Sequence, residues 1–243
     1  MRIVELYDLG RSEYQSTWEL QAVVQKRIID EKLDVRRNGM PESERSNDVL
    51  LLVEHPHVYT LGKSGDENNL LKNEEELREI GAQFVPIDRG GDITYHGPGQ
   101  IVGYPILDLE RYQIGVHQYV ENLEHVIIRT CNDYDIEAEI IEGLPGVWVD
   151  HAKICAIGIK CSRYVSMHGF AFNVNTDLNY FGNIVPCGIQ DKDVTSLEQL
   201  TGHPLDINEV KNRLTRHLEE VFEVSIIKDG ELPELQEQFS YLK

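Results

Sequence analysis

Residues 89–100 have the sequence RGGDITYHGPGQ, with four glycines and one proline among twelve residues. The segments QFVPIDR before this stretch, DITYH within it and QIVGYPILDL at its end are rich in β-branched and aromatic residues, as is typical of strands. Glycine and proline interrupt strands and allow tight turns. The stretch therefore predicts two junctions between three short strands.

The rest of the chain alternates predicted strands with amphipathic helices. Strand patterns cover residues 2–10, 49–62 with a break at Pro56, 146–150, 153–162 and 168–175. Apolar residues at helical spacing predict helices over 13–33, 115–131 and around 207–222, with Asp206 and Glu209 as a capping box for the last. A short helix is predicted between Asn73 and Gly81. Because strands occur in runs between helices, we predict an α+β fold with a mixed sheet flanked by helices.

Length and composition favour one domain over residues 1–243, with an exposed polar loop at about 34–48. The net charge of −19 argues against a nucleic-acid partner. The N-terminal residues lack the apolar segment of a signal peptide, and no apolar run approaches the roughly 18 residues of a membrane span, so no membrane partner is expected. The four cysteines do not suggest a disulfide framework, so we expect a cytoplasmic protein.

Several side chains in the predicted turns and strands are candidates for chemistry. Glycines around Arg89 and His96 would let the backbone approach a ligand, although the same residues could simply form turns. Cys187, in NIVPCGI, is either a reactive thiol on a bend or a buried small residue. Lys153 shares one face of its strand with the apolar residues of that strand. It is either a strand-end lysine whose ammonium group reaches water or a partly desolvated amine with a function.

Neither a cofactor nor a metal is expected from the motifs. The glycine-rich stretch matches neither the dinucleotide-binding nor the P-loop pattern. The spacing of His151, Cys155, Cys161 and His168 fits no compact zinc site, and Cys131, Cys155 and Cys161 are better explained as core residues.

Four motifs together resemble the octanoyltransferase family of lipoate biosynthesis. They are RGGDITYHGPGQ, PGVWVDHAKICAIGIK, HGFAFNVN and IVPCGI, and the resemblance extends from about Leu50 to Leu200. It implies the fold of the lipoate and biotin protein ligases, Cys187 as the acyl-thioester nucleophile and Lys153 as its partner. It also implies three substrate-binding segments: Arg89, Gly90, Gly91, Asp92, Ile93, Thr94, Tyr95 and His96; Ala156, Ile157 and Gly158; and Gly169, Phe170 and Ala171.

The resemblance implies an ATP-independent enzyme, which we expect to be a monomer. It would transfer an octanoyl (or lipoyl) group from acyl carrier protein, as the first step of lipoate biosynthesis, to lipoyl domains of 2-oxoacid dehydrogenase complexes and to the glycine cleavage H protein. Two features depart from the family: His57 replaces a proline, and the polar loop is long. An ATP-dependent lipoate or biotin ligase and a non-catalytic acyl-carrier-binding module are the alternatives. Because a carrier protein is expected to be acidic, docking would need a local basic rim, with Arg36, Arg37, Arg45, Lys160 and Arg163 as candidates.

Overall fold

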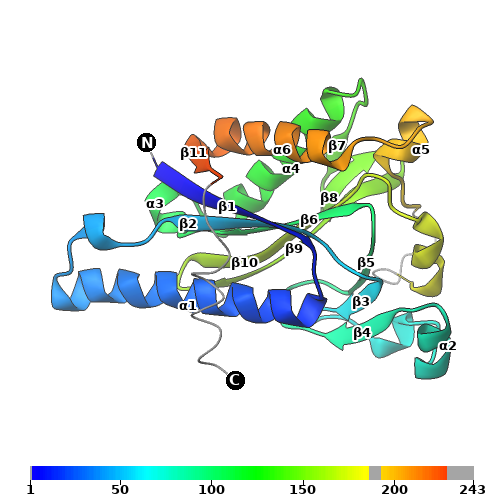
Figure 1. Cartoon of the computed structure of the whole chain (residues 1–243), viewed down its shortest axis with the longest axis horizontal. Coiled ribbons are helices and arrows are strands. Elements are labelled where there is room, and N and C mark those ends of the chain that lie inside the picture. The colour runs from blue at the N-terminus through cyan, green and yellow to red at the C-terminus, as the bar shows by residue number, and fades with distance from the viewer. Residues whose placement is uncertain (1, 186–192, 229–243) are drawn as a thin grey trace.

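The computed structural model describes residues 2–185 and 193–228 of the chain. Within these ranges an eight-stranded mixed sheet forms the centre of the molecule (Figure 1), with strand order β11-β1-β2-β6-β10-β9-β8-β7. Its strands are β1 (Arg2–Arg11), β2 (Asp48–Glu54), β6 (Gln100–Ile106), β7 (Glu139–Ile141), β8 (Leu144–Val149), β9 (Ala152–Ser162), β10 (Val165–Asn173) and β11 (Val224–Ile227). The predicted mixed sheet flanked by helices is confirmed.

A second, three-stranded sheet lies beside the large one. It consists of β3 (Val58–Leu61) between β4 (Gln83–Pro86) and β5 (Ile93–His96). The strand predicted over residues 49–62 is thus divided at Pro56 between the two sheets. The glycine-rich stretch connects the sheets, because its first glycines precede β5 and its GPG segment links β5 to β6. The predicted pair of junctions between three strands is confirmed.

Helices cover both faces of the large sheet (Figure 1). On one face lie α4 (Val116–Asn132) and α6 (Ile207–Phe222), whose apolar sides share a large buried core with the sheet. On the other face lies the long helix α1 (Tyr14–Asn38), where Leu20, Val24 and Ile28 pack in a second core with Val102 and Ala171. The remaining helices are α2 (Glu74–Glu79), α3 (Leu109–Tyr112) and α5 (Leu197–Thr201), with 3₁₀ turns η1 (Glu42–Glu44), η2 (Glu67–Asn69) and η3 (Leu178–Asn183).

The polar segment 34–48 is more ordered than its composition suggests. Helix α1 continues to Asn38 and ends at Gly39, whose φ of 73° fits the left-handed C-cap that glycine favours. Further on, the side chain of Arg45 is only 4% exposed and pairs with the buried Asp108 at 2.7 Å. The prediction of a continuous exposed loop is therefore wrong at both of these places, because one part propagates a helix and the other satisfies a buried carboxylate.

Two predicted helix caps have different outcomes. In α2, Asn73 and Glu76 form the expected reciprocal capping box. In α6, Asp206 accepts from the Asn208 N–H, while Glu209 pairs with Arg213 one turn later. The cap of α6 is confirmed, but its reciprocal half is replaced by an ion pair on the helix surface.

Candidate active site

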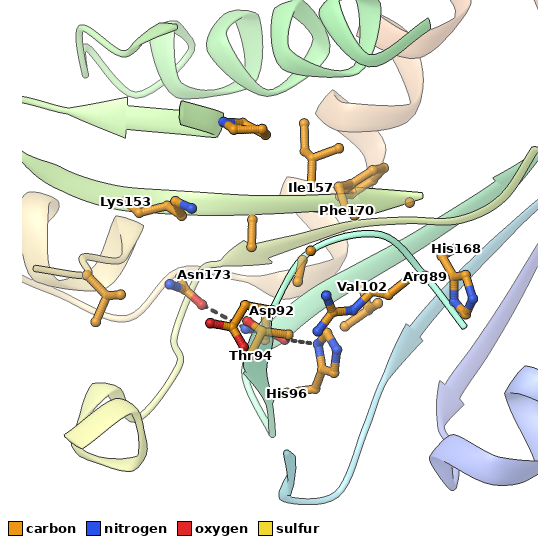
Figure 2. Close-up of a pocket in the computed structure, with 18 of the residues that line it drawn as sticks. Arg89, Asp92, Thr94, His96, Val102, Lys153, Ile157, His168, Phe170 and Asn173 are labelled. Atoms are coloured by element: carbon orange, nitrogen blue, oxygen red, sulfur yellow. Dashed lines mark hydrogen bonds between the residues drawn. The ribbon is translucent and has the colours of Figure 1, made fainter. Parts of the chain in front are cut away.

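A cavity of about 390 Å³ opens between the large sheet and the glycine-rich stretch, and Figure 2 shows the residues around it. It is bordered by Lys153 and by twelve of the fourteen residues expected to bind substrate. These are Arg89, Gly91, Asp92, Ile93, Thr94, His96, Ala156, Ile157, Gly158, Gly169, Phe170 and Ala171. Three segments that are far apart in sequence thus meet at one site.

Small residues on β9 and β10 border this cavity and let other segments pack closely against the two strands. Gly158 pairs with Gly169, and Ala156 pairs with Ala171 on the neighbouring strand. A Cβ atom at Gly169 would lie 2.2 Å from the Gly103 carbonyl oxygen, so only glycine fits there. The result is a channel with little side-chain volume and an apolar surface, suited to an alkyl chain.

Arg89 braces the glycine-rich stretch as well as bordering the cavity. Its side chain is buried, and its guanidinium donates to the Thr60 carbonyl at 2.9 Å and to the Gly90 carbonyl at 3.0 Å. The Gly90 N–H in turn donates to the Ile159 carbonyl at 3.0 Å. These bonds attach the stretch to both sheets and fix one wall of the cavity.

Tyr95 lies elsewhere, although it belongs to an expected binding segment. Successive side chains of a strand point to opposite faces, so His96 turns toward the cavity and Tyr95 away from it. The Tyr95 hydroxyl hydrogen-bonds with His57 Nδ1 at 2.7 Å, and the His57 ring stacks on Tyr180 with centroids 4.0 Å apart. His57, whose role the sequence left open, is therefore part of an aromatic cluster behind β5. Gly90, like Tyr95, does not border the cavity.

His96 is buried in the wall of the cavity as a neutral imidazole. Gln100 uses its amide nitrogen as donor to the Tyr95 carbonyl, so its Oε1 accepts from His96 Nδ1 at 2.9 Å. His96 Nε2 is then an acceptor and faces the Thr60 hydroxyl at 3.4 Å. Burial lowers the pKa of His96 well below its usual range, consistent with this single tautomer.

The same polar chain continues to the strand that carries Lys153. Gln100 Nε2 donates to Asn173 Oδ1 at 2.9 Å, and Asn173 Nδ2 donates to the Thr195 carbonyl at 3.0 Å. The Thr195 N–H donates to the Lys153 carbonyl at 3.0 Å. Figure 2 marks the hydrogen bonds between His96 and Asn173, and with the bonds through Thr195 they connect the glycine-rich stretch to the Lys153 backbone by satisfied buried bonds.

Lys153 lies at one end of the channel, next to the point where the chain returns from the Cys187 segment. Its Nζ atom is 4.7 Å from the centroid of the Trp148 ring, a cation–π distance. Its backbone N–H donates to the Asp193 carbonyl at 2.9 Å, and Asp193 and Val194 also border the cavity. Cys187 itself lies outside the described residues.

The first residues of β8 close the cavity beside Lys153. Gly146 has a φ of 111°, which favours glycine, and a Cβ there would lie 2.4 Å from the Cys155 carbonyl oxygen. Its N–H donates to Glu124 Oε1 of α4 at 3.0 Å. The start of β8 thus approaches β9 closely and places Leu144 and Pro145 at the cavity.

The sequence reasoning missed several residues of this site, above all Gln100, Trp148 and Asn173. Each of them lies within one of the four motifs, and that position was the feature of the sequence that could have identified them. The missed His168, rejected as a zinc ligand, also borders the cavity.

The other cysteines behave as core residues. Cys131 and Cys155 are fully buried, and burial raises the pKa of the Cys131 thiol to about 12 and that of Cys155 well above its usual range. Burial also raises the pKa of the half-buried Cys161. Within residues 2–185 and 193–228 no cluster of three metal-ligating side chains occurs, and no helix there is long and apolar enough to cross a membrane.

Comparison with known proteins shows the family to which this chain belongs. Residues 19–219 match the family model described as the lipoyl protein ligase A/B catalytic domain. The octanoyltransferase of Flavobacterium johnsoniae is 52% identical over 92% of this chain and 98% of its own length. The octanoyltransferase of Bacteroides thetaiotaomicron is 48% identical, over 86% of this chain and 91% of its own.

Solved structures share the fold. Lipoate-protein ligase A bound with ATP superposes with a TM-score of 0.70 at 13% identity, covering 100% of this chain and 94% of that one. A bipartite lipoate protein ligase from Thermoplasma acidophilum superposes with a TM-score of 0.68 at 13% identity, covering 99% and 91%. The family match and the close relatives together show that this chain belongs to the octanoyltransferases of the lipoyl protein ligase A/B catalytic-domain family.

Proposed function

We propose that this protein transfers an octanoyl group from acyl carrier protein to a lysine of lipoyl domains. The observation that carries the proposal is the apolar channel along Ala156, Gly158, Gly169 and Ala171, which begins beside Lys153. Six methylenes buried in such a channel contribute about 5 kcal/mol at roughly 0.8 kcal/mol each. The relatives at 47–52% identity that are named octanoyltransferases support the same reaction.

The proposed reaction has two acyl transfers. The Cys187 thiolate attacks the thioester carbonyl of octanoyl-carrier protein, a new C–S bond forms, and the carrier's thiolate leaves and takes a proton. The amine of the acceptor lysine then attacks octanoyl-Cys187, so that an amide forms, the C–S bond breaks and Cys187 is regenerated. The first step exchanges one thioester for another and the second converts a thioester to an amide, so no ATP is required.

Lys153 is proposed to assist both transfers. As an ammonium group it stabilises the Cys187 thiolate. As a neutral amine it accepts a proton from the attacking lysine. The Trp148 ring beside Nζ and the backbone bonds to residues 193 and 195 support this role, because they fix Lys153 at the cavity.

The acceptors we propose are lipoyl domains of 2-oxoacid dehydrogenase complexes and the glycine cleavage H protein, with the enzyme acting as a monomer in the cytoplasm.

The basic residues expected to dock the carrier protein need revision. Arg45 is buried against Asp108, Arg36 pairs with Glu110, and Lys160 pairs with Asp88 at 2.5 Å. With these three cations already in ion pairs and a net charge of −19, docking would depend on contacts close to the cavity mouth more than on long-range attraction.

An ATP-dependent ligase is the second candidate, since lipoate-protein ligase A shares the fold. The identity of 13% to that ligase against 52% to an octanoyltransferase favours transfer without ATP.

Intact-mass measurement after mixing the protein with octanoyl-carrier protein tests the proposal. We expect an octanoyl adduct without ATP, lost in Cys187→Ser and retained in Cys155→Ser and Cys161→Ser. Transfer that requires ATP and survives Cys187→Ser would establish the ligase instead. No adduct and no transfer under either condition would favour the binding module.

Single-turnover kinetics of each half-reaction test Lys153. Arginine keeps the positive charge but does not release a proton near neutral pH. Lys153→Arg should therefore form octanoyl-Cys187 and pass the acyl group on slowly, whereas Lys153→Ala should impair both steps. Rapid second-step transfer by Lys153→Arg would leave only the electrostatic role.

A further inference from the structure

Asp92 places a carboxylate at the border of the apolar cavity. The residue is half-buried, and it borders the cavity together with Thr94. Its carboxylate accepts two hydrogen bonds, from the Ile93 N–H to Oδ1 at 2.7 Å and from Asn69 Nδ2 to Oδ2 at 2.8 Å. Both donors are neutral groups. Because a carboxylate offers about four acceptor positions, positions remain for a ligand.

The loop next to Asp92 holds this carboxylate in place. A Cβ atom at Gly65 would lie 2.6 Å from Asp92 Oδ1, so only glycine lets the loop pack against the carboxylate. The Gly62 N–H donates to the Asp92 carbonyl at 3.3 Å, and the 3₁₀ turn η2 supplies Asn69. The carboxylate is therefore oriented before a ligand arrives, and such preorganisation reduces the entropic cost of binding.

Asp92 differs in its partners from Asp88, the carboxylate that precedes the glycine-rich stretch. Asp88 pairs with Lys160 at 2.5 Å and with His168 at 2.9 Å. Within residues 2–185 and 193–228, Asp92 has its two neutral donors and no cation at ion-pair distance. A carboxylate in this state favours a cationic ligand group, because charge-assisted hydrogen bonds are roughly twice as strong as neutral ones.

The proposed reaction brings one such cation to the cavity. The acyl thioester is neutral, whereas the acceptor is a lysine, whose side chain is an ammonium group at neutral pH. Lys153 borders the same cavity as Asp92 and Thr94. Figure 2 shows these three side chains in the same half of the view, with His168 in the other half. The polar groups of this half of the cavity therefore suit the acceptor amine.

We propose that Asp92 is a specificity-determining residue that binds the ammonium group of the acceptor lysine, with the Thr94 hydroxyl as a second acceptor. This inference rests on the proposed octanoyl transfer and deepens it. Two N–H groups of the ammonium donate to Asp92 and Thr94, and the third proton passes to neutral Lys153, which frees the lone pair that attacks the acyl carbonyl. As the amide forms, the nitrogen loses a second proton and the departing thiolate takes one up.

Deacylation by two nucleophiles tests the inference. Octanoyl-enzyme is mixed with lipoyl domain or with hydroxylamine, a small amine that is largely uncharged at neutral pH, and intact mass follows each reaction. In Asp92→Asn, the rate with lipoyl domain relative to hydroxylamine should fall roughly tenfold or more from wild type, because a charge-assisted hydrogen bond is lost. The ratio is taken within each enzyme, so a general loss of rate or stability does not change it.

Two further variants sharpen the test. Asparagine keeps the shape of Asp92, and Asn69 can reverse its amide to preserve their hydrogen bond, so Asp92→Asn removes mainly the charge. Thr94→Val removes a neutral acceptor and should lower the same ratio only a few-fold. Glu67→Gln is the matched control, because it removes a negative charge from an exposed residue of η2 that does not border the cavity. Its ratio should equal that of wild type.

A wild-type ratio in Asp92→Asn would overturn the inference while leaving octanoyl transfer intact. An equal fall in Glu67→Gln would also overturn it, because long-range charge would then account for the effect. Failure of wild type to form octanoyl-enzyme or to pass the acyl group on would contradict the proposed function itself, and the inference with it.

Discussion

The two faces of β9 and β10 are built from the same two strands but serve opposite purposes. On the face covered by α4 and α6, Cys155 and Phe172 are fully buried in the large core, and Ile157 and Phe170 pack there too. On the other face lie the residues that alternate with these along the strands, Ala156, Gly158, Gly169 and Ala171, which are small and border the channel. Because the side chains alternate, each pair of neighbouring residues contributes one member to stability and one to the space for a ligand.

The largest expected effect is on the filled face. Phe172→Ala removes a fully buried ring from the large core and should lower the free energy of unfolding by about 3–5 kcal/mol. Urea unfolding at neutral pH measures this, and at a temperature where the variant is folded its transfer rate should stay within a few-fold of wild type. A large loss of transfer in fully folded protein would show that the two faces are not independent.

Filling the open face should have the opposite result. Ala156→Phe places a ring in the channel, and octanoyl transfer should fall at least about 100-fold, or about 2.7 kcal/mol in barrier, with little change in unfolding free energy. Ala22→Phe, on the exposed surface of α1, is the matched control and should retain activity. Unchanged transfer by Ala156→Phe would place the acyl chain outside this channel.

The faces should also differ in their response to pH, because three buried histidines whose pKa values are lowered, His55, His96 and His168, lie on the cavity side. Burial lowers the pKa of His55 and His168 to about 4, and it lowers the pKa of His96 well below its usual range. Below pH 6.5 the unfolded chain binds protons that the folded protein excludes, so stability present at pH 7 is lost as pH falls from 6.5 toward 4. Each histidine contributes a slope of up to about 1.4 kcal/mol per pH unit.

Urea unfolding between pH 7.5 and 5 measures this slope. His55→Gln should reduce it by the contribution of one histidine, whereas replacing the exposed His125 of α4 by Gln is the control. A slope that His55→Gln leaves unchanged would place the proton uptake at other groups.

The smallest expected effect is on chain length. Ala156→Gly widens the channel by one methyl group, so decanoyl transfer should rise relative to octanoyl by less than about tenfold, since one buried CH₂ group is worth about 0.8 kcal/mol, or about fourfold. Competition between the two carrier-protein thioesters gives the ratio. A preference for shorter chains in this variant would show that Ala156 does not limit the channel.

The sequence by itself determined where helices and strands form and which residues of β9 and β10 share a face. Alternation of apolar residues predicted the strands, and helical spacing predicted the face of α1 that packs on the sheet, because both depend on contacts a few residues apart. The motifs around Arg89, Lys153 and Gly169 were predicted to form one site, and the structure brings them to one cavity.

Only the tertiary structure decided which side of each strand faces that cavity. Period-2 alternation states that Tyr95 and His96 point in opposite directions, but the arrangement of the two sheets decides that His96 borders the cavity and Tyr95 packs behind it. The hydrogen bond of His168 with Asp88 likewise joins residues that are 80 apart in sequence. Such properties arise from groups that meet only on folding, so no local pattern encodes them.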